Sequence, residues 1–286
     1  MKKLIIGTAQ LVNNYGISNY DKKKTFKRIT HFLEFCFQNS LNSFDVAPDY
    51  DSEKIIGKFV KNNNIKNVNI SSKIPSLKFL NSKKKLDHIK KNIENSLEKL
   101  GVSKLENLYF HDENDLNFFL KNDERINEIA NNYKIQNLGF SLYSKDKFNI
   151  LNKNKFIKTF QVPMNIINND FDKIKSNKKI VCRSIFLQGL LINKKLKTKN
   201  KILKNFNQSL MELANKKKIN LYSLCLSYIF KHSKIQKIIV GFDDLKQLKK
   251  FLNFKKKIIE IDQDLALVRS IIDQNLHNII KDPRKW

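Results

Sequence analysis

The sequence predicts an α/β fold, a closed (β/α)8 TIM barrel, from three observations. Short β-branched or aromatic runs alternate with stretches of helical periodicity along the chain, which indicates a parallel sheet covered by helices. About eight such units fit into 286 residues, a length typical of a single barrel. The seven glycines lie at least nine residues apart, so neither GxGxxG nor GxxxxGK occurs. The alternative, an open doubly wound sheet, is disfavoured, and we expect residues 1–286 to form one domain.

The expected strands and helices follow from the two kinds of periodicity. Strands are expected at residues 4–10, 42–47, 68–74, 105–111, 135–141, 157–163, 179–186 and 235–242. The clearest helix spans residues 82–101, where Ser82 can cap the start and Gly101 can close the end. Apolar faces at helical spacing also occur over residues 26–37 and 202–213. A further face over residues 265–279 predicts an extra C-terminal helix.

The composition is that of an ordinary globular protein, with 41% apolar and 29% charged residues. No apolar run approaches the roughly 20 residues of a membrane helix, and the N-terminal apolar stretch is too short for a signal peptide. We therefore expect a soluble, cytoplasmic protein without a membrane partner. Cys36, Cys182 and Cys225 lie far apart and form no metal-binding pattern, so we expect reduced thiols and no metal site.

The formal net charge of +28 raises the question of nucleic-acid binding. Fifty of the 55 basic residues are lysines, and they are spread over all the expected helices alongside abundant asparagine and isoleucine. A specific nucleic-acid binder usually gathers arginine and lysine on one face with aromatic residues between them. We expect no specific nucleic-acid partner, only weak adsorption of polyanions at low salt.

Polar residues follow the expected strands at the ends where a barrel carries its chemistry. The second strand ends at Asp45, with Tyr50 five residues later, the third at Lys73 and the fourth at His111. A phenol has an unperturbed pKa of about 10, and a nearby lysine held by a carboxylate lowers the pKa of such a group. An imidazole within reach of the same oxygen would orient it, so these four residues together can protonate a carbonyl oxygen.

Each of these four residues also has a structural interpretation when it is taken alone. An aspartate after a strand often caps a helix, a tyrosine is often half-buried packing, and a histidine is often a satisfied polar group. The occurrence of all four at the ends of consecutive strands favours the functional interpretation.

The same residues carry a resemblance to a known family. The segment FDVAPDYDSEKIIGKF, at 44–59, resembles the signature of the aldo/keto reductases, and ISSKIP and LYFHDEND resemble the third and fourth strands of that family. The resemblance extends over nearly the whole chain through GTAQLVNNYGISN, LGFSLYS, FQVPMN, RSIFLQGLL and IIVGFDDLKQLKKFL. The motifs GTAQ, GFSLYS and RSIFLQGLL are similar in sequence to those of a bacterial branch of the family that is linked to surface-carbohydrate biosynthesis.

The resemblance implies a reductase that uses NADPH, or NADH, without a Rossmann domain. Tyr50 would be the general acid, Lys73 the group that tunes it, Asp45 the partner of Lys73, and His111 the residue that orients the carbonyl. The residues implied for cofactor binding are Gly7, Thr8, Ser141, Gln161, Arg183, Ser184, Gly241, Asp243 and Gln247. Ser141 and Gln161 would hold the nicotinamide carboxamide, and the last three the adenosine phosphate end.

Two alternatives stay open at this point. The implied substrate is a small aldehyde or ketone, for example a keto-sugar, whereas a barrel that only binds the cofactor as a sensor would need no turnover. Arg183 stands where many members of the family have a tyrosine stacked on the nicotinamide. We expect it to contact the cofactor, and the alternative is a clamp for an anionic substrate. The oligomeric state cannot be predicted from the sequence.

Overall fold

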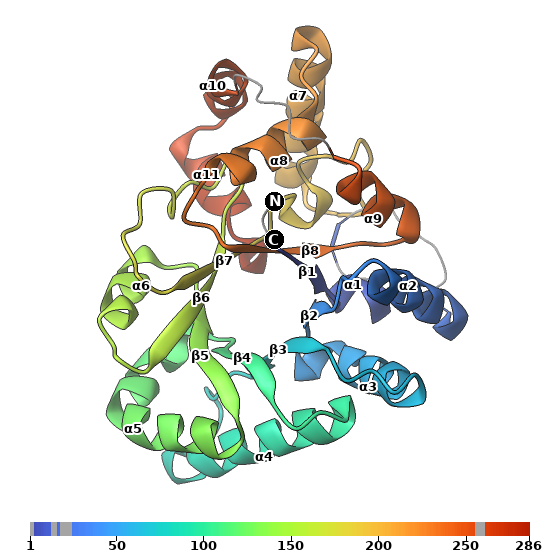
Figure 1. Ribbon diagram of the computed structural model, residues 1–286. Coiled ribbons are helices and arrows are strands. Elements are labelled where there is room, and N and C mark those ends of the chain that lie inside the picture. The colour runs from blue at the N-terminus through green and yellow to red at the C-terminus, as the bar shows by residue number, and fades with distance from the viewer. Residues whose placement is uncertain (1–2, 13–15, 18–24, 255–260) are drawn as a thin grey trace.

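The computed structural model describes residues 3–12, 16–17, 25–254 and 261–286, and within them the strands form a closed parallel barrel in chain order (Figure 1). The strands are β1 (Lys3–Gly7), β2 (Ser43–Asp45), β3 (Asn69–Ile74), β4 (Leu105–Phe110), β5 (Ile135–Ser141), β6 (Ile157–Pro163), β7 (Lys179–Arg183) and β8 (Lys237–Gly241). The fold class predicted from the sequence is therefore confirmed.

The two largest differences from the predicted strands are at β1 and β7, which each end three residues early. The run at 4–10 forms a strand only to Gly7, because the short helix α1 (Ala9–Val12) begins two residues later. The run at 179–186 ends at Arg183, because Ser184 takes a φ of 59° in the left-handed region, which a strand cannot continue through. Both early endings place polar residues at the mouth of the barrel.

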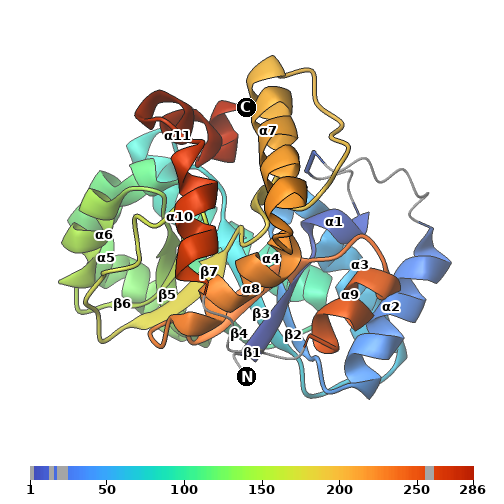
Figure 2. The same ribbon diagram turned by 90° about the horizontal axis from the view of Figure 1, so that it is seen from above.

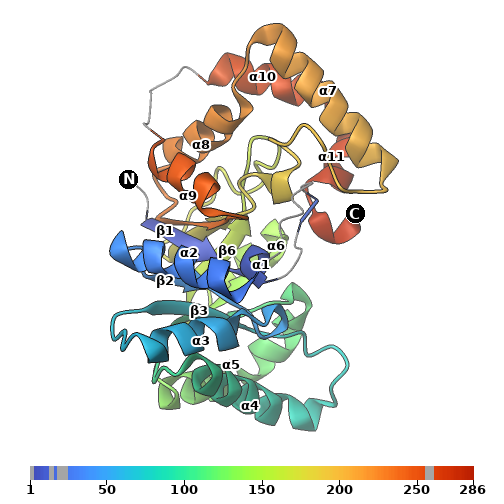
Figure 3. The same cartoon turned by 90° about the vertical axis from the view of Figure 1, so that its right-hand side faces the viewer.

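Helices surround the barrel on its outside (Figures 1 and 3). After α1 these are α2 (Phe26–Gln38), α3 (Ser52–Asn62), α4 (Ser82–Leu100), α5 (Leu116–Asn132), α6 (Lys145–Asn152), α7 (Lys201–Lys217), α8 (Leu221–Lys231), α9 (Leu245–Leu252), α10 (Asp262–Ser270) and α11 (Gln274–Ile280). The cap of α4 is Asn81, whose side chain accepts from the Lys83 amide, so the prediction of Ser82 was one residue late. Gly101 closes α4 with a φ of 65°, as predicted.

The strict alternation of strands and helices is broken after β6. The described connection from β6 to β7 contains no helix, while α7 and α8 both lie between β7 and β8. The C-terminal helices cover the β6–β7 connection instead (Figure 2). Arg269 of α10 donates to the Ile166 carbonyl and His277 of α11 contacts the Ile167 carbonyl. The segment 265–279, expected to form one helix, therefore belongs to two helices, α10 and α11, which pack against the β6–β7 connection.

The core lies between the strands and the helices, and is lined by fully buried aliphatic and aromatic side chains. Cys36, Cys182 and Cys225 are all buried. In the described part of the chain, no helix has the length and apolarity that crossing a bilayer requires. Within the same residues, no group of three His, Cys, Asp or Glu side chains is placed to hold a metal ion.

Candidate active site

Strand parity gathers the predicted residues on the inner face of the barrel. In the parallel register, Gly7 pairs with Asp45 and Gly241, and Ser141 pairs with Gln161. Residues two apart on a strand point to the same side. The strand-borne residues predicted for the site therefore share one parity and face inward at the C-terminal ends of the strands: Gly7, Asp45, Lys73, His111, Ser141, Gln161, Arg183 and Gly241.

The Asp45 carboxylate is the most heavily bonded group of the site. Its Oδ2 lies 2.6 Å from Lys73 Nζ, and its Oδ1 accepts from Gln161 Nε2 at 2.6 Å. Lys73 Nζ also donates to the Val46 carbonyl at 2.8 Å. All three polar side chains are almost completely buried, which makes the pair geometrically rigid. Strand ends that are far apart in sequence, β2, β3 and β6, are thus joined through one carboxylate.

The backbone at Asp45 is held by Thr8, which follows β1 and in turn contacts α3. The fully buried Thr8 hydroxyl donates to the Asp45 carbonyl at 2.8 Å and lies 2.8 Å from the Ser52 hydroxyl. Glu53, also buried in the first turn of α3, accepts from Ser72 at 2.8 Å. The Ser-Glu start of α3 therefore braces β1 and β3 beside the site. Thr8 was predicted to bind cofactor, and the structure gives its side chain these scaffold contacts.

Tyr50 stands next to Lys73 and His111. It ends the short 3-10 helix η1 (Pro48–Tyr50), and Lys73 Nζ lies 5.3 Å from the centroid of its ring. The Tyr50 and His111 rings meet edge to face with centroids 6.4 Å apart. Burial raises the pKa of Tyr50 above that of a free phenol, and the charge of Asp45 raises it further. The Arg183 charge lowers it by a smaller amount, so the phenol stays protonated and able to donate. The expectation that the lysine beside Tyr50 lowers the pKa of the phenol is therefore wrong for this structure, because burial outweighs nearby positive charge.

His111 is held in its neutral form. Burial and, to a smaller extent, the positive charges of Lys73 and Arg183 together lower the pKa of its imidazole to about 3. A neutral imidazole can donate one N–H and accept at its other nitrogen, so it can hold a carbonyl oxygen without carrying charge. The four residues predicted to be catalytic are thus brought together as one cluster.

Ser141 and Gln161 lie side by side at the ends of β5 and β6, where they are paired in register. Both are buried. The Gln161 Oε1 atom is buried and has no hydrogen-bond partner among the described residues, whereas Gln161 Nε2 donates to Asp45. An orphaned buried acceptor is costly unless a ligand supplies a donor. The carboxamide NH2 of a nicotinamide is such a donor, so these residues fit the group that the sequence implies.

Arg183 ends β7 beside Tyr143, a residue that sequence reasoning did not single out. The Arg183 guanidinium lies 4.2 Å from the centroid of the Tyr143 ring, and that of Arg284 lies 3.8 Å from the same centroid. Arg284 comes from the C-terminal 3-10 helix η4 (Pro283–Lys285) and pairs with Glu113 at 3.3 Å. Glu113 in turn accepts from the backbone amides of Tyr143 and Ser144. The C-terminus is therefore clasped onto the loop after β5.

Gly241, Asp243 and Gln247 come together in a second group at the β8–α9 turn. The Gln247 side chain bonds both the backbone amide and the carboxylate of Asp243, at 2.9 and 3.2 Å. Gln10 Nε2 lies 3.4 Å from Asp243 Oδ1, and its side chain passes so close to Gly241 that a Cβ there would lie 1.8 Å from Gln10 Oε1. Glycine at 241 thus leaves room for the contact between α1 and the β8–α9 turn.

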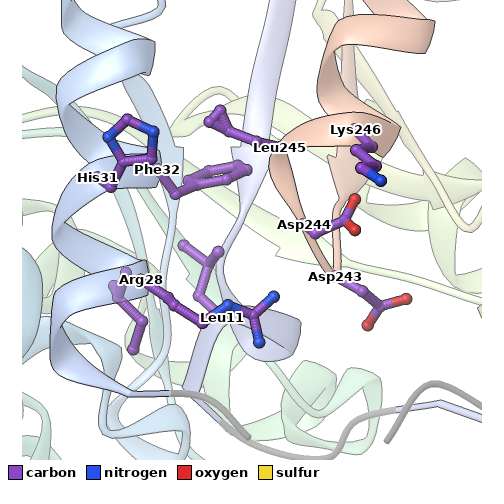
Figure 4. A pocket seen from close by; sticks show the side chains of 9 residues that line it. Leu11, Arg28, His31, Phe32, Asp243, Asp244, Leu245 and Lys246 are labelled. Atoms are coloured by element: carbon purple, nitrogen blue, oxygen red, sulfur yellow. The ribbon is translucent and has the colours of Figure 1, made fainter. Parts of the chain in front are cut away.

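A cavity of about 220 Å³ lies between α2 and this turn, away from the catalytic cluster. Figure 4 shows Arg28, His31 and Phe32 on α2, with Asp243, Asp244, Leu245 and Lys246 on the opposite wall. Lys249 and Lys250, the other two cations that follow β8, lie over the rings of Phe35 and Tyr222.

Arg28 is the cation of this cavity that sequence reasoning missed. It lies on α2, far from β8 in sequence, so only the closure of the barrel brings the two together. The sequence feature that could have drawn attention to Arg28 is that arginine is rare in this chain, which has five arginines and fifty lysines. Arg28 and Lys246 supply positive charge to the cavity, while Asp243 and Asp244 supply negative charge.

Comparison with known proteins agrees with this geometry. Solved structures similar in fold include the glycerol dehydrogenase AKR11B4 from Gluconobacter oxydans (TM-score 0.68, 16% identity, 95% of this chain and 94% of that chain). The holo form of the aldo-keto reductase AKR11C1 from Bacillus halodurans is a second (TM-score 0.67, 16% identity, 96% and 95%). A search of curated proteins found no match. Residues 3–272 match the model of the aldo/keto reductase family, so the chain belongs to that family of oxidoreductase enzymes.

Proposed function

We propose that this protein reduces an aldehyde or ketone to an alcohol with NADPH as its cofactor. The observation that carries this proposal is the buried Asp45–Lys73 ion pair beside Tyr50 and His111 at the mouth of the barrel. An aldehyde or ketone gains one hydride at carbon and one proton at oxygen, and this cluster supplies the proton. The reduced nicotinamide supplies the hydride when it is bound.

The proton comes from Tyr50. Its phenol is protonated because burial raises its pKa, and it donates its proton as the carbonyl oxygen gains negative charge and becomes a stronger base. Lys73, fixed by Asp45, and neutral His111 stabilise that developing charge. The Asp45 carboxylate is already bonded on both oxygens by Lys73 and Gln161, so it positions Lys73 without taking the proton itself.

The cofactor would be held at two places. Ser141 and the orphaned Oε1 of Gln161 would bind the carboxamide. Ser184 would line the adjacent end of β7, and Gly7 would line the end of β1. Gly241, Asp243 and Gln247 would hold the adenosine phosphate end, beside the cavity that Arg28 lines. Keto-sugars belong in the substrate panel, because the chain resembles a branch linked to surface-carbohydrate biosynthesis.

The test is turnover by Tyr50→Phe. This variant loses the proton donor but none of the proposed cofactor contacts, so kcat should fall by at least about a thousandfold while NADPH affinity is kept. Tyr133→Phe, which removes a phenol on the outside of the barrel, is the matched control. NADPH oxidation is followed against a panel of aldehydes, ketones and keto-sugars. More than about a tenth of wild-type activity in Tyr50→Phe would remove Tyr50 from its role.

A wild-type protein that binds NADPH but turns over no member of the panel would favour the alternative of a cofactor-binding sensor. Unchanged NADPH affinity in Gln161→Leu would show that the carboxamide is held elsewhere. The two measurements separate a wrong reaction from a wrong cofactor site.

A further inference from the structure

Arg183 points into the barrel at the level of the catalytic cluster. Its strand neighbour Val181 pairs with the inward-facing Gln161, and the next inward position along β7 is Arg183 itself. The intervening Cys182 belongs to the core outside the barrel, which fixes the alternation. Arg183 is therefore an inward-facing cation at the mouth.

The positive charge of Arg183 has no carboxylate within ion-pair distance among the residues that the structure describes. Its contacts are long ones to neutral acceptors, Nη2 to the Leu142 carbonyl at 3.3 Å and Nη1 to the Ser184 hydroxyl at 3.4 Å. Its Nε is buried without a hydrogen-bond partner. Arg284, on the same Tyr143 ring, is instead paired with both Glu113 and Asp282. A half-buried guanidinium normally has an anion, so Arg183 is poised for one.

The field of this charge reaches the two groups that would hold the reacting oxygen. Arg183 lowers the pKa of both Tyr50 and His111. Because Arg183 also faces inward at the same mouth, one short substrate with its carbonyl at Tyr50 could place an anionic group at Arg183. Arginine is suited to this task because its planar fork can donate two parallel hydrogen bonds to a carboxylate or a phosphate.

We propose that Arg183 binds an anionic oxygen group, a carboxylate or a phosphate, on the carbonyl substrate. The proposal rests on the proposed function and names its substrate class: short carbonyl compounds that carry a negative charge away from the reacting carbon. Tyr143, in contact with the guanidinium, holds it in place, and the Arg284–Glu113 pair holds Tyr143. The C-terminal clasp is in this way part of substrate selection.

The test compares aldehydes that differ in charge. One pair is 4-carboxybenzaldehyde with methyl 4-formylbenzoate, and the other is glyceraldehyde 3-phosphate with glyceraldehyde, which separates a carboxylate from a phosphate. The measured quantity is the ratio of kcat/KM for the charged and the neutral member. We expect this ratio to fall about 10- to 100-fold in Arg183→Met for at least one pair. Arg183→Lys keeps the positive charge but not the planar guanidinium, so its ratio should lie between those of wild type and Arg183→Met.

Arg125→Met is the control, because it removes the same charge from an exposed position on α5 and should leave both ratios unchanged. Thermal melts confirm that each variant is folded, and NADPH affinity is titrated in parallel. An unchanged ratio in folded Arg183→Met overturns the proposal. An equal fall in kcat/KM for the charged and the neutral aldehyde, together with weaker NADPH binding, also overturns the proposal. That result would assign Arg183 to the cofactor, as the sequence suggests.

The anion site can be tested without turnover. Calorimetric binding of benzene-1,4-dicarboxylate and of glycerol 3-phosphate to the NADPH-saturated protein should weaken about tenfold or more in Arg183→Met. If wild type reduces no aldehyde yet binds one of these anions through Arg183, the proposed reaction fails while the anion site stands. If it reduces the neutral aldehydes but binds neither anion, the anion site fails alone.

Discussion

His111 keeps a neutral imidazole in a cluster that contains two cations, and this has a consequence for stability. Its pKa in the folded protein is about 3, below the ordinary value of 6.5 that it regains on unfolding. At a pH between these two pKa values, His111 is protonated in the unfolded chain but neutral in the folded protein. The free energy of unfolding must therefore fall as the pH drops from about 6.5 to about 3, and this contribution changes no further below that.

His111→Gln tests this sign, because glutamine keeps a polar group but does not titrate. Urea unfolding of both proteins is measured at pH 7.5 and pH 4.5. Between pH 7.5 and pH 4.5 the free energy of unfolding of wild type should fall by about 1 to 2 kcal/mol more than that of the variant. This figure is smaller than the full pKa shift implies, because the ring is partly exposed to solvent. Equal losses would mean that His111 titrates normally in the folded protein.

Arg28 and Lys246 face Asp243 and Asp244 across the cavity, so a 2′-phosphate would meet both signs of charge. We expect NADPH to bind more tightly than NADH, but only by about tenfold, or about 1.4 kcal/mol. Arg28→Met should reduce that preference without changing NADH affinity, since NADH lacks the phosphate that the guanidinium would contact. Fluorescence titration of both cofactors checks this, with Arg125→Met as the control. Equal affinities in wild type would contradict the prediction.

At the scale of elements, α3 and α4 approach so closely that one glycine decides their packing. A Cβ on Gly57 would lie 1.9 Å from the Lys99 carbonyl oxygen and 2.8 Å from the Leu100 Cα, which are backbone atoms that cannot swing away. Because Ser52 and Glu53 at the start of α3 brace the catalytic strands, this packing also supports the site.

We expect Gly57→Ala to lower the free energy of unfolding by about 1 to 3 kcal/mol, because α3 must move away from α4. Gly101→Ala is the matched control. A Cβ there meets no atom within 4 Å, and only its φ of 65° opposes alanine, at about 1 kcal/mol. Urea unfolding should rank Gly57→Ala as the more damaging change. The reverse order would show that the helix contact is loose.

At the scale of the whole molecule, the net charge of +28 acts on every part of the fold. Like charges repel one another more strongly in the compact state than in the expanded one, and salt screens this repulsion over a Debye length of about 10 Å at 0.1 M. The dispersed lysines thus make the folded state sensitive to ionic strength.

The melting temperature should therefore rise by several degrees between about 20 mM and about 300 mM KCl. A non-ionic solute at matched osmolality serves as the control for effects other than screening. A melting temperature that stays constant, or falls, would show that local ion pairs such as Lys231–Asp262 offset the net repulsion.

The sequence by itself determined the fold class, the family and the candidate catalytic residues. Each of these depends on local information: periodicity identifies strands and helices, short motifs carry the resemblance to the family, and Asp45, Lys73 and His111 stand out because they follow expected strands. The expected residues Gln161 and Ser141 follow from the same rule.

Only the tertiary structure decided what these residues touch. Gln161 shares the Asp45 carboxylate, Arg28 faces Asp243, and Arg284 reaches Glu113, although each pair is far apart in the chain. It also decided that the β6–β7 connection would be covered by α10 and α11 in place of a helix of its own. The physical reason is that hydrogen bonding, desolvation and charge depend on distance in space, which periodicity along a chain does not record.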